Sequence, residues 1–146
     1  MKALVCDCSV SAAWCLEDET SAAADEVLAL AAGAEILVPP IWAAEMANVF
    51  WAAERRGRIS AVDADAALAA LGRLPIRVDT GTPDSAHRLL LVARARNLSA
   101  YDASYLELAL RQGVPLATLD RRLSEAAHAA GVELVMSQSR QSDREN

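Results

Sequence analysis

The chain has few of the residues from which disulfide frameworks, zinc sites and membrane spans are built. Its three cysteines, Cys6, Cys8 and Cys15, are odd in number and crowded at one end, which suits neither a disulfide framework nor a CxxC zinc site. We expect them to be reduced packing residues, because free cysteine commonly behaves as a small buried hydrophobe. The longest apolar runs, residues 27–32 and 89–93, fall well short of the roughly 20 residues that span a bilayer.

The chain also lacks features that several other classes of protein require. Lys2 is its only lysine, whereas phosphatase and response-regulator sites combine their strand-end aspartates with a lysine. Asp7-Cys8-Ser9 stands where a dinucleotide-binding domain would have GxGxxG after its first strand. The sequence therefore argues against these classes. The apolar run before Asp7 is too short for the h-region of a signal peptide, so we expect a cytoplasmic protein.

What the chain does contain is enough apolar residues for one core and a marked excess of acid. Its 146 residues, of which 53% are hydrophobic, predict a single domain. The formal net charge of −6 argues against a protein that coats nucleic acid by neutralising many phosphates. A nuclease remains compatible with this charge, because an enzyme that holds metal ions concentrates acid at one point, and the ions then face the phosphate.

Short apolar strands alternate with helices along the chain. Strands are predicted over residues 3–6, 36–38, 75–78, 114–118 and 132–135, and helices from about residue 9 and over residues 21–32, 40–56, 61–74, 82–96, 100–112 and 121–130. This alternation indicates an α/β sandwich in which helices cover both faces of a parallel sheet. We expect the domain to occupy residues 1–136 and the polar tail, residues 137–146, to be disordered.

Two aspartates, Asp7 and Asp120, follow predicted strands directly. Ligands of open parallel sheets gather beyond the carboxyl ends of the strands, so both side chains are candidates for a site. Each also has a purely structural alternative, because aspartate is a favourable N-cap for a helix that begins at the next residues. The sequence leaves these two interpretations open.

Two further acids lie on predicted helices that face the core. Glu45 falls about 60° from the centre of the apolar stripe of its helix, which places its carboxylate at the edge of a buried face. Asp102 aligns with Leu106 and Ala109 on the core side of another helix. The structural alternatives are a surface acid for Glu45 and, for Asp102, the acidic part of a cap that Ser99 begins.

Four carboxylates that converge at one end of a sheet would raise one another's pKa unless something positive neutralised them. Ligation by oxygen alone, without His or Cys, suits Mg²⁺ or Mn²⁺, which keep several waters and bind phosphate. Such ions polarise phosphoryl oxygens and generate hydroxide from bound water. If Asp7, Glu45, Asp102 and Asp120 converge, phosphodiester hydrolysis is the reaction that fits them.

Four stretches of the chain together resemble the VapC-like PIN-domain toxins of bacterial toxin–antitoxin pairs, in their order and approximate spacing. They are residues 5–10 with Trp14 and Glu17, residues 39–49, residues 99–109 and residues 116–123. The resemblance covers nearly the whole chain. It implies a PIN-like three-layer sandwich, Mg²⁺- or Mn²⁺-dependent endoribonuclease activity, a homodimer, and a tight complex with a small VapB-like antitoxin that blocks the site.

The resemblance also implies roles for individual residues. Asp7, Glu45 and Asp102 correspond to the core metal ligands, and Asp120 corresponds to a more variable fourth acid that acts through water. Hydroxyl positions that support the acids are matched by Ser9 and Thr118, and a polar position one turn beyond Glu45 is matched by Asn48. Cys8 departs from the pattern, because such proteins more often have a small residue such as Ala or Thr there. The alternative from another class is a non-catalytic PIN-like scaffold that binds a protein partner.

Other residues that could carry chemistry are given structural interpretations. His87 and His128 lie in helices remote from the acid motifs and are expected at the surface or partly packed. The three tryptophans, Trp14, Trp42 and Trp51, could stack on bases, but we expect packing or dimer contacts, since tryptophan is a normal core and interface residue. The basic cluster of Arg55, Arg56 and Arg58 would either contact RNA phosphates or solvate a helix end, and both interpretations stay open.

Overall fold

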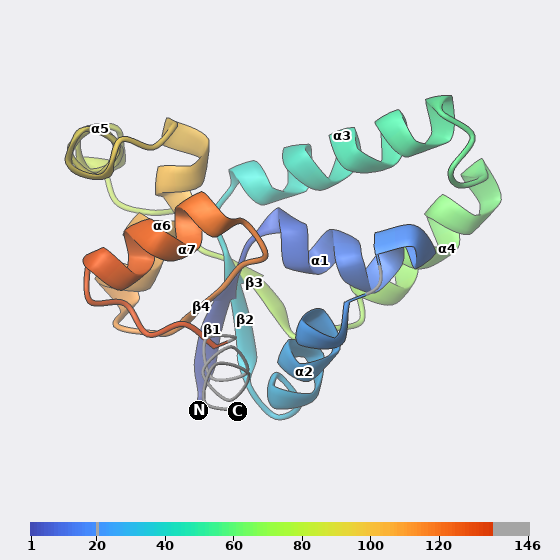
Figure 1. Ribbon diagram of the computed structural model, residues 1–146, viewed down its shortest axis with the longest axis horizontal. Coiled ribbons are helices and arrows are strands. Elements are labelled where there is room, and N and C mark those ends of the chain that lie inside the picture. Colours follow the sequence, from blue (N-terminus) through green and yellow to red (C-terminus); the bar gives the residue numbers. More distant parts are fainter. Residues whose placement is uncertain (20, 136–146) are drawn as a thin grey trace, which may run out of the picture.

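A parallel four-stranded sheet forms the centre of the computed structural model, which describes residues 1–19 and 21–135 (Figure 1). The strands are β1 (Ala3–Cys6), β2 (Glu35–Val38), β3 (Ile76–Val78) and β4 (Leu116–Ala117), in the order β3-β2-β1-β4. Val5 in β1 lies opposite Leu37 of β2 and Leu116 of β4. The first strand of the chain is thus central, and it is buried on both faces.

Eight helical segments surround the sheet within the described residues. They are α1 (Cys8–Cys15), the short 3-10 helix η1 (Glu17–Glu19), α2 (Ala22–Leu30), α3 (Ile41–Arg55), α4 (Ala61–Leu71), α5 (Ser85–Arg96), α6 (Ala100–Gln112) and α7 (Arg121–Ala129). In Figure 1, α1 and α2 lie on one side of the sheet, and α6 and α7 lie on the other. The predicted three-layer α/β sandwich is confirmed.

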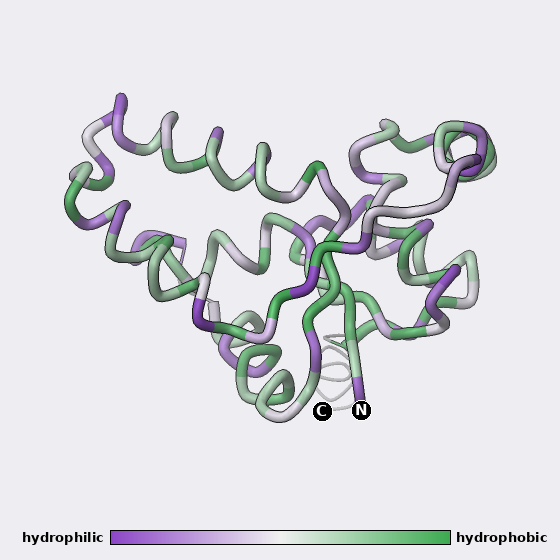
Figure 2. The backbone as a smooth tube through the Cα atoms, turned by 180° about the vertical axis from the view of Figure 1, so that it is seen from behind, coloured by the Kyte–Doolittle hydropathy of each residue, from purple (hydrophilic) through white to green (hydrophobic). Residues whose placement is uncertain are grey.

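Alternation along the strands determines which helices each face contacts. One core cluster joins the sheet to α6 and α7 and includes Val5, Leu37, Leu106 and Leu123. The cluster on the opposite face joins the sheet to α1 and α2 and includes Leu4, Ile36, Val10 and Val27. A third cluster connects α1, α3 and α4. Figure 2 shows the central strands as continuous hydrophobic segments, as expected for a sheet that is covered on both faces.

Most helix starts lie where the sequence predicts them, because local capping groups specify them. The side chains of Ser21, Ser60 and Ser99 accept backbone N–H bonds at the starts of α2, α4 and α6. Helix α6 ends at Gly113, which has φ of 64°, a left-handed conformation that glycine adopts without strain. Two predicted helix boundaries are wrong by one turn: α4 ends at Leu71, and α5 begins at Ser85.

The predicted start of α5 is wrong because the preceding residues form a turn. The Ser85 hydroxyl accepts the N–H of Thr82 at 2.8 Å, and the Thr82 hydroxyl donates to Asp84. The predicted last strand is reduced to a single bridge between Leu116 and Leu134. The predicted tail, residues 137–146, lies outside the described residues.

Two further expectations from the sequence concern the cysteines and the membrane. All three cysteines are free, and Cys6 is buried, as predicted for packing residues. Within residues 1–19 and 21–135, no helix combines the length and the apolar character that a membrane crossing requires.

Candidate functional site

Asp7 lies at the carboxyl end of β1, where the chain turns into α1. Its Oδ1 accepts from the Ser9 hydroxyl at 2.6 Å and from the N–H of Val10 at 3.2 Å, and its Oδ2 accepts from the Thr118 hydroxyl. The side chain is buried, with 5% of its surface exposed. Asp7 therefore caps α1, as its structural alternative predicts, but it also accepts two hydroxyl bonds that a cap does not need.

Burial is the main influence on the charge of Asp7. It raises the pKa of this carboxyl to about 6, although the hydrogen bonds from Ser9, Thr118 and Val10 act in the opposite direction. The nearby carboxylate of Asp120 raises the pKa further. A buried acid that receives hydrogen bonds and still has a raised pKa lacks a positive neighbour.

The segment after β4 connects Asp7 to the fourth predicted acid. The Thr118 hydroxyl, which donates to Asp7, also accepts the N–H of Asp120 at 3.0 Å. The Ser9 hydroxyl accepts the N–H of Leu119 at 2.9 Å. Asp120 is itself exposed and caps α7, since its Oδ1 accepts the N–H of Leu123 at 3.0 Å. Ser9 and Thr118 thus hold the β1 and β4 ends in register around Asp7.

Glu45 of α3 and Asp102 of α6 form the other half of the cluster. The Tyr105 hydroxyl donates to Oε1 of Glu45 at 2.6 Å. Burial raises the pKa of Glu45, the Tyr105 bond lowers it, and the charge of Asp102 raises it. The pKa of Asp102 is also raised, first by burial and then by Asp120, whereas the bond from Ser99 acts in the opposite direction. Both carboxyls are only partly buried.

The four acids therefore approach one another in pairs. Asp120 influences both Asp7 and Asp102, and Asp102 influences Glu45. Across residues 1–19 and 21–135, no three His, Cys, Asp or Glu side chains already lie together as a group that could hold a metal ion. Asn48, one turn beyond Glu45, is exposed and makes no side-chain hydrogen bond to a described residue. Asp7 and Glu45 also both act on Cys8, so the four acids lie around one region beyond the carboxyl ends of β1 and β4, here called the row of acids.

No basic side chain among the described residues forms an ion pair with any of the four acids. Seven ion pairs join residues of the described ranges, and none of them includes Asp7, Glu45, Asp102 or Asp120. The charge of Arg122 lowers the pKa of Asp102, but its guanidinium donates to the carbonyl of Asn97 at 3.1 Å. Apart from this effect of Arg122 on Asp102, no positive charge in this part of the chain is among the causes that shift the pKa values of Asp7, Glu45 and Asp102.

Comparison with known proteins identifies the family. A family profile described as "PIN domain" matches residues 4–129. This chain belongs to the PIN-domain family. A search of curated proteins found no match. Among solved structures, the chain is similar to the PAE2754 protein of Pyrobaculum aerophilum, with a TM-score of 0.66, 28% sequence identity, and coverage of 97% of this chain and 96% of that one.

Family membership indicates the general chemistry of the site. PIN domains are generally nucleases that use divalent metal ions and act on RNA, so the chain is assigned to the nucleases at this level. The donor atoms at the edge of the sheet fit such ions, because the candidate ligands are carboxylates and therefore offer oxygen alone. Their raised pKa values also show that a positive charge at this edge would stabilise the ionised forms.

Cys8 does not alter this donor set. Its thiol donates to the sulfur of Met46 at 3.4 Å. Burial, followed by the charges of Glu45 and Asp7, raises the pKa of Cys8 to about 12. Mg²⁺ and Mn²⁺ prefer oxygen ligands to sulfur, so this thiol is not expected to join the carboxylates as a ligand. Cys8 therefore packs within the PIN domain beside the acids.

Tyr105 belongs to the site but was not predicted from the sequence. It is 1% exposed, and its ring belongs to the core cluster that joins the sheet to α6 and α7. In the sequence, a tyrosine at such a position is indistinguishable from an apolar packing residue. The available signal is its position three residues after Asp102, which places both side chains on the same side of α6. A buried tyrosine hydroxyl needs a partner, and in this PIN domain the partner is Glu45.

Proposed function

We propose that the chain is a Mg²⁺- or Mn²⁺-dependent endoribonuclease whose working residues are Asp7, Glu45, Asp102 and Asp120. The observation that carries this proposal is the row of four carboxylates at one edge of the sheet, three of them with raised pKa values and none in an ion pair with a described residue. Such a row favours a cation that comes from outside the chain.

Asp7, Glu45 and Asp102 are the residues that would hold the ion, and Asp120 would act through water. A bound divalent ion polarises a phosphoryl oxygen and lowers the pKa of water that attacks the phosphodiester. The contribution of the chain is to fix the ligands before the substrate arrives. The Ser9 and Thr118 hydroxyls orient both oxygens of Asp7, and the Tyr105 hydroxyl orients Glu45.

We further propose that this nuclease is the toxin of a cytoplasmic toxin–antitoxin pair, that it forms a homodimer, and that a VapB-like antitoxin neutralises it. The support is the sequence resemblance to VapC-like toxins over residues 5–10, 39–49, 99–109 and 116–123. Co-expression with a short reading frame directly upstream would test this part: a stable complex that suppresses cleavage is expected, and free activity in its presence would contradict it.

The test of the nuclease proposal compares the wild type with Asp102→Asn on several tRNAs and a ribosomal RNA fragment. Asp63→Asn is a matched control, because the N–H of Asp63 bonds to the capping Ser60 just as that of Asp102 bonds to Ser99, on a helix remote from the acids. We expect cleavage by the wild type and by Asp63→Asn, dependence on Mg²⁺ or Mn²⁺, and inhibition by EDTA.

Two outcomes would overturn the nuclease proposal. Cleavage that survives Asp102→Asn would show that the activity does not come from this row of acids. Absence of cleavage by all three proteins, together with no Mn²⁺ binding by calorimetry, would favour the alternative of a non-catalytic scaffold that binds a protein partner.

A further inference from the structure

The three tryptophans occupy different environments. Trp14 donates its indole N–H to the carbonyl of Ala24 at 2.7 Å, and Trp42 donates to the Ser11 hydroxyl at 3.1 Å. Both are partly buried. Trp51 is 57% exposed, and its indole N–H has no acceptor among residues 1–19 and 21–135. The packing interpretation therefore holds for the first two, whereas Trp51 presents its ring to solvent.

The arginines near Trp51 differ in whether they form ion pairs with described residues. Arg58 pairs with Asp18 at 2.7 Å and with Glu19 at 3.0 Å, so its charge ties η1 to the end of α3. Arg55 and Arg56 are exposed and have no ion pair with any described residue. The guanidinium carbon of Arg55 lies 5.6 Å from the centroid of the Trp51 ring, which is within the range of a cation–π contact.

This aromatic and cationic pair lies on the same helix as Glu45, nearer its C-terminal end. At about 100° per residue, Asn48, Trp51 and Arg55 fall within about 60° of one another on α3, and Glu45 lies one turn before Asn48 on the adjoining edge. All three are exposed, and the opposite face of α3 buries Met46, Phe50 and Ala53 in the third core cluster. The row from Glu45 to Arg55 spans ten residues, or about 15 Å of helix.

We infer that the outer face of α3 formed by Asn48, Trp51 and Arg55, here called the α3 track, binds a single-stranded segment of RNA that leads to the carboxylates. The inference rests on the proposed ribonuclease function. Trp51 stacks on a base, Arg55 contacts a phosphate, and Asn48 offers an amide close to Glu45. The RNA segment thus runs along α3 from Arg55 to the carboxylates.

Charge complementarity favours RNA over a protein partner at this surface. The chain as a whole is acidic, with a net charge of −6. Arg55 and Arg56, which form no ion pair with a described residue and lie close to an exposed indole, are a local exception. Aromatic stacking combined with nearby cations is the usual means by which proteins hold single strands without reading their sequence. Stacking is also tolerant of base identity, so the α3 track determines where the strand lies and leaves sequence choice to other contacts.

The test measures binding of a fluorescein-labelled single-stranded oligoribonucleotide in the Asp102→Asn background with Mg²⁺, so that cleavage does not interfere. Trp51→Ala is expected to raise Kd by about 10-fold or more, and Trp51→Phe to retain most of the affinity. Arg55→Gln is expected to weaken binding and to reduce the salt slope by about 0.7, the value for one phosphate contact on a single strand. Arg96→Gln is the matched control, since Arg96 is an exposed arginine in the last turn of α5.

In the cleaving protein, Trp51→Ala should raise KM while kcat stays close to that of the wild type. Unchanged RNA affinity in Trp51→Ala would overturn the inference, even if the wild type cleaves RNA in an Asp102-dependent manner. Conversion of a dimer to a monomer by Trp51→Ala, seen by light scattering, would also overturn it, because a second copy would then cover this face. Trp51-dependent binding by a protein that does not cleave would support RNA binding by the α3 track, but it would remove the nuclease proposal and with it the role of the track in leading RNA to a cleavage site.

Discussion

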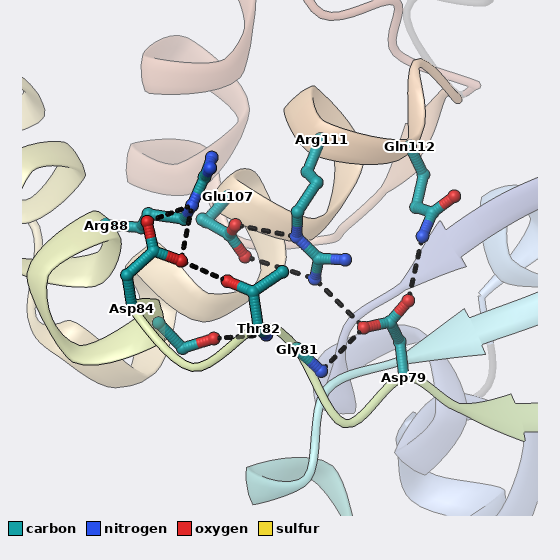
Figure 3. Close-up of polar contacts among 9 residues, drawn as sticks. Asp79, Gly81, Thr82, Asp84, Arg88, Glu107, Arg111 and Gln112 are labelled. Atoms are coloured by element: carbon teal, nitrogen blue, oxygen red, sulfur yellow. Dashed lines mark hydrogen bonds and ion pairs between the residues drawn. The ribbon is translucent and has the colours of Figure 1, made fainter.

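Two buried aspartates follow parallel strands of the same sheet, and the charges around them differ. Asp79 follows β3 and accepts from the Arg111 guanidinium at 3.0 Å, from the amide of Gln112 at 2.8 Å and from the N–H of Gly81 at 2.8 Å (Figure 3). Asp7 follows β1 and accepts from two hydroxyls and one N–H. Both have several donors, but only Asp79 has a cation.

The pKa values of the two carboxyls move in opposite directions. The hydrogen bond from Arg111 is the main cause that lowers the pKa of Asp79, whereas burial raises the pKa of Asp7 to about 6. Burial also acts to raise the pKa of Asp79, but there the bond from Arg111 outweighs it. At Asp7 burial is the largest cause, and the charge of Asp120 adds to it. The charge of an acid at a strand end is already neutralised when the fold supplies a cation beside it. An acid without such a cation is available for an external ion.

The two acidic regions are also joined physically by α6. Arg111 of this helix donates to Glu107 at 2.8 Å as well as to Asp79, so it fixes the C-terminal half of α6 to the end of β3. Asp102 and Tyr105 lie in the N-terminal half of the same helix. The network of Asp79, Glu107 and Arg111, whose acids are paired with a cation, therefore anchors the helix that carries Asp102 and Tyr105. The acids of this network have a structural role, unlike the four proposed catalytic acids.

The largest expected effect is a difference in RNA cleavage between variants of the two aspartates. Asp7→Asn removes a proposed metal ligand and should lower RNA cleavage by at least about 1,000-fold. Asp79→Asn should keep cleavage within about 10-fold of the wild type, because its partners hold α6 and do not contact the substrate. The two variants would be compared by initial cleavage rates at saturating Mg²⁺. A larger loss for Asp79→Asn would show that we have assigned the two aspartates the wrong way round.

The second effect concerns stability and tests the role of the cation. Arg111→Met leaves Asp79 and Glu107 buried without their positive partner and should reduce the free energy of unfolding by about 3 kcal/mol. Arg88→Met is the control, because Arg88 forms an exposed pair with Asp84 (Figure 3), whose loss should cost less than about 1 kcal/mol. Urea denaturation would measure both, and equal effects would contradict a special role for Arg111.

The third effect is a gain in stability at the proposed active site. The pKa of Asp7 in the folded protein, about 6, lies above its ordinary value of 3.8, so the folded state binds the proton more tightly and ionisation of Asp7 destabilises it. This destabilisation is absent below about pH 4, grows up to about pH 6 and is complete above it. The difference between the two pKa values corresponds to about 3 kcal/mol. Part of this is offset in Asp7→Asn, because an amide nitrogen cannot accept the hydrogen bonds that the carboxylate accepts. Without metal, Asp7→Asn should therefore raise the free energy of unfolding at pH 7.5 by about 1 to 2 kcal/mol.

The opposite pH dependence is expected for Asp79. Its lowered pKa means that its ionised form stabilises the fold at neutral pH, and this contribution is lost as the pH falls below the ordinary value of 3.8. Urea denaturation of the wild type, Asp7→Asn and Asp79→Asn from about pH 2.5 to 7.5 would separate the two, because the effect of Asp7 changes between about pH 4 and 6 and that of Asp79 below about pH 4. A stability gain for Asp7→Asn that persists unchanged at pH 4 would contradict the assigned cause.

The sequence predicts those features that local interactions determine. Strand β1 and the starts of α4 and α6 are correctly predicted, because a compact apolar run and a capping serine carry the signal within a few residues. The last predicted strand shrinks to one bridge, since strand length depends on the neighbour with which it pairs. The boundary of α5 depends on a turn whose hydrogen bonds form only in three dimensions.

The candidate site is predictable to a similar extent. Strand-end aspartates can be found in the sequence, but the sequence places Asp79 after a strand just as it places Asp7. The difference is made by Arg111, which lies 32 residues from Asp79 and contacts it only through the fold. Tyr105 is missed for the same reason, because its partner Glu45 lies 60 residues away.

The smallest expected effect comes from removing the Tyr105 hydroxyl, a neutral hydrogen-bond donor to Glu45. Tyr105 serves Glu45 as Arg111 serves Asp79, but a hydroxyl orients the carboxylate without neutralising it. Tyr105→Phe keeps the buried ring and removes this bond, so the pKa of Glu45 should rise further and cleavage should fall by about 10-fold, as for loss of a group that orients a ligand. Higher Mg²⁺ should recover part of the rate, since the loss lies in holding the ion. A loss of the same size in Asp63→Asn, or no loss in Tyr105→Phe, would remove Tyr105 from the site and leave Glu45 positioned by α3 alone.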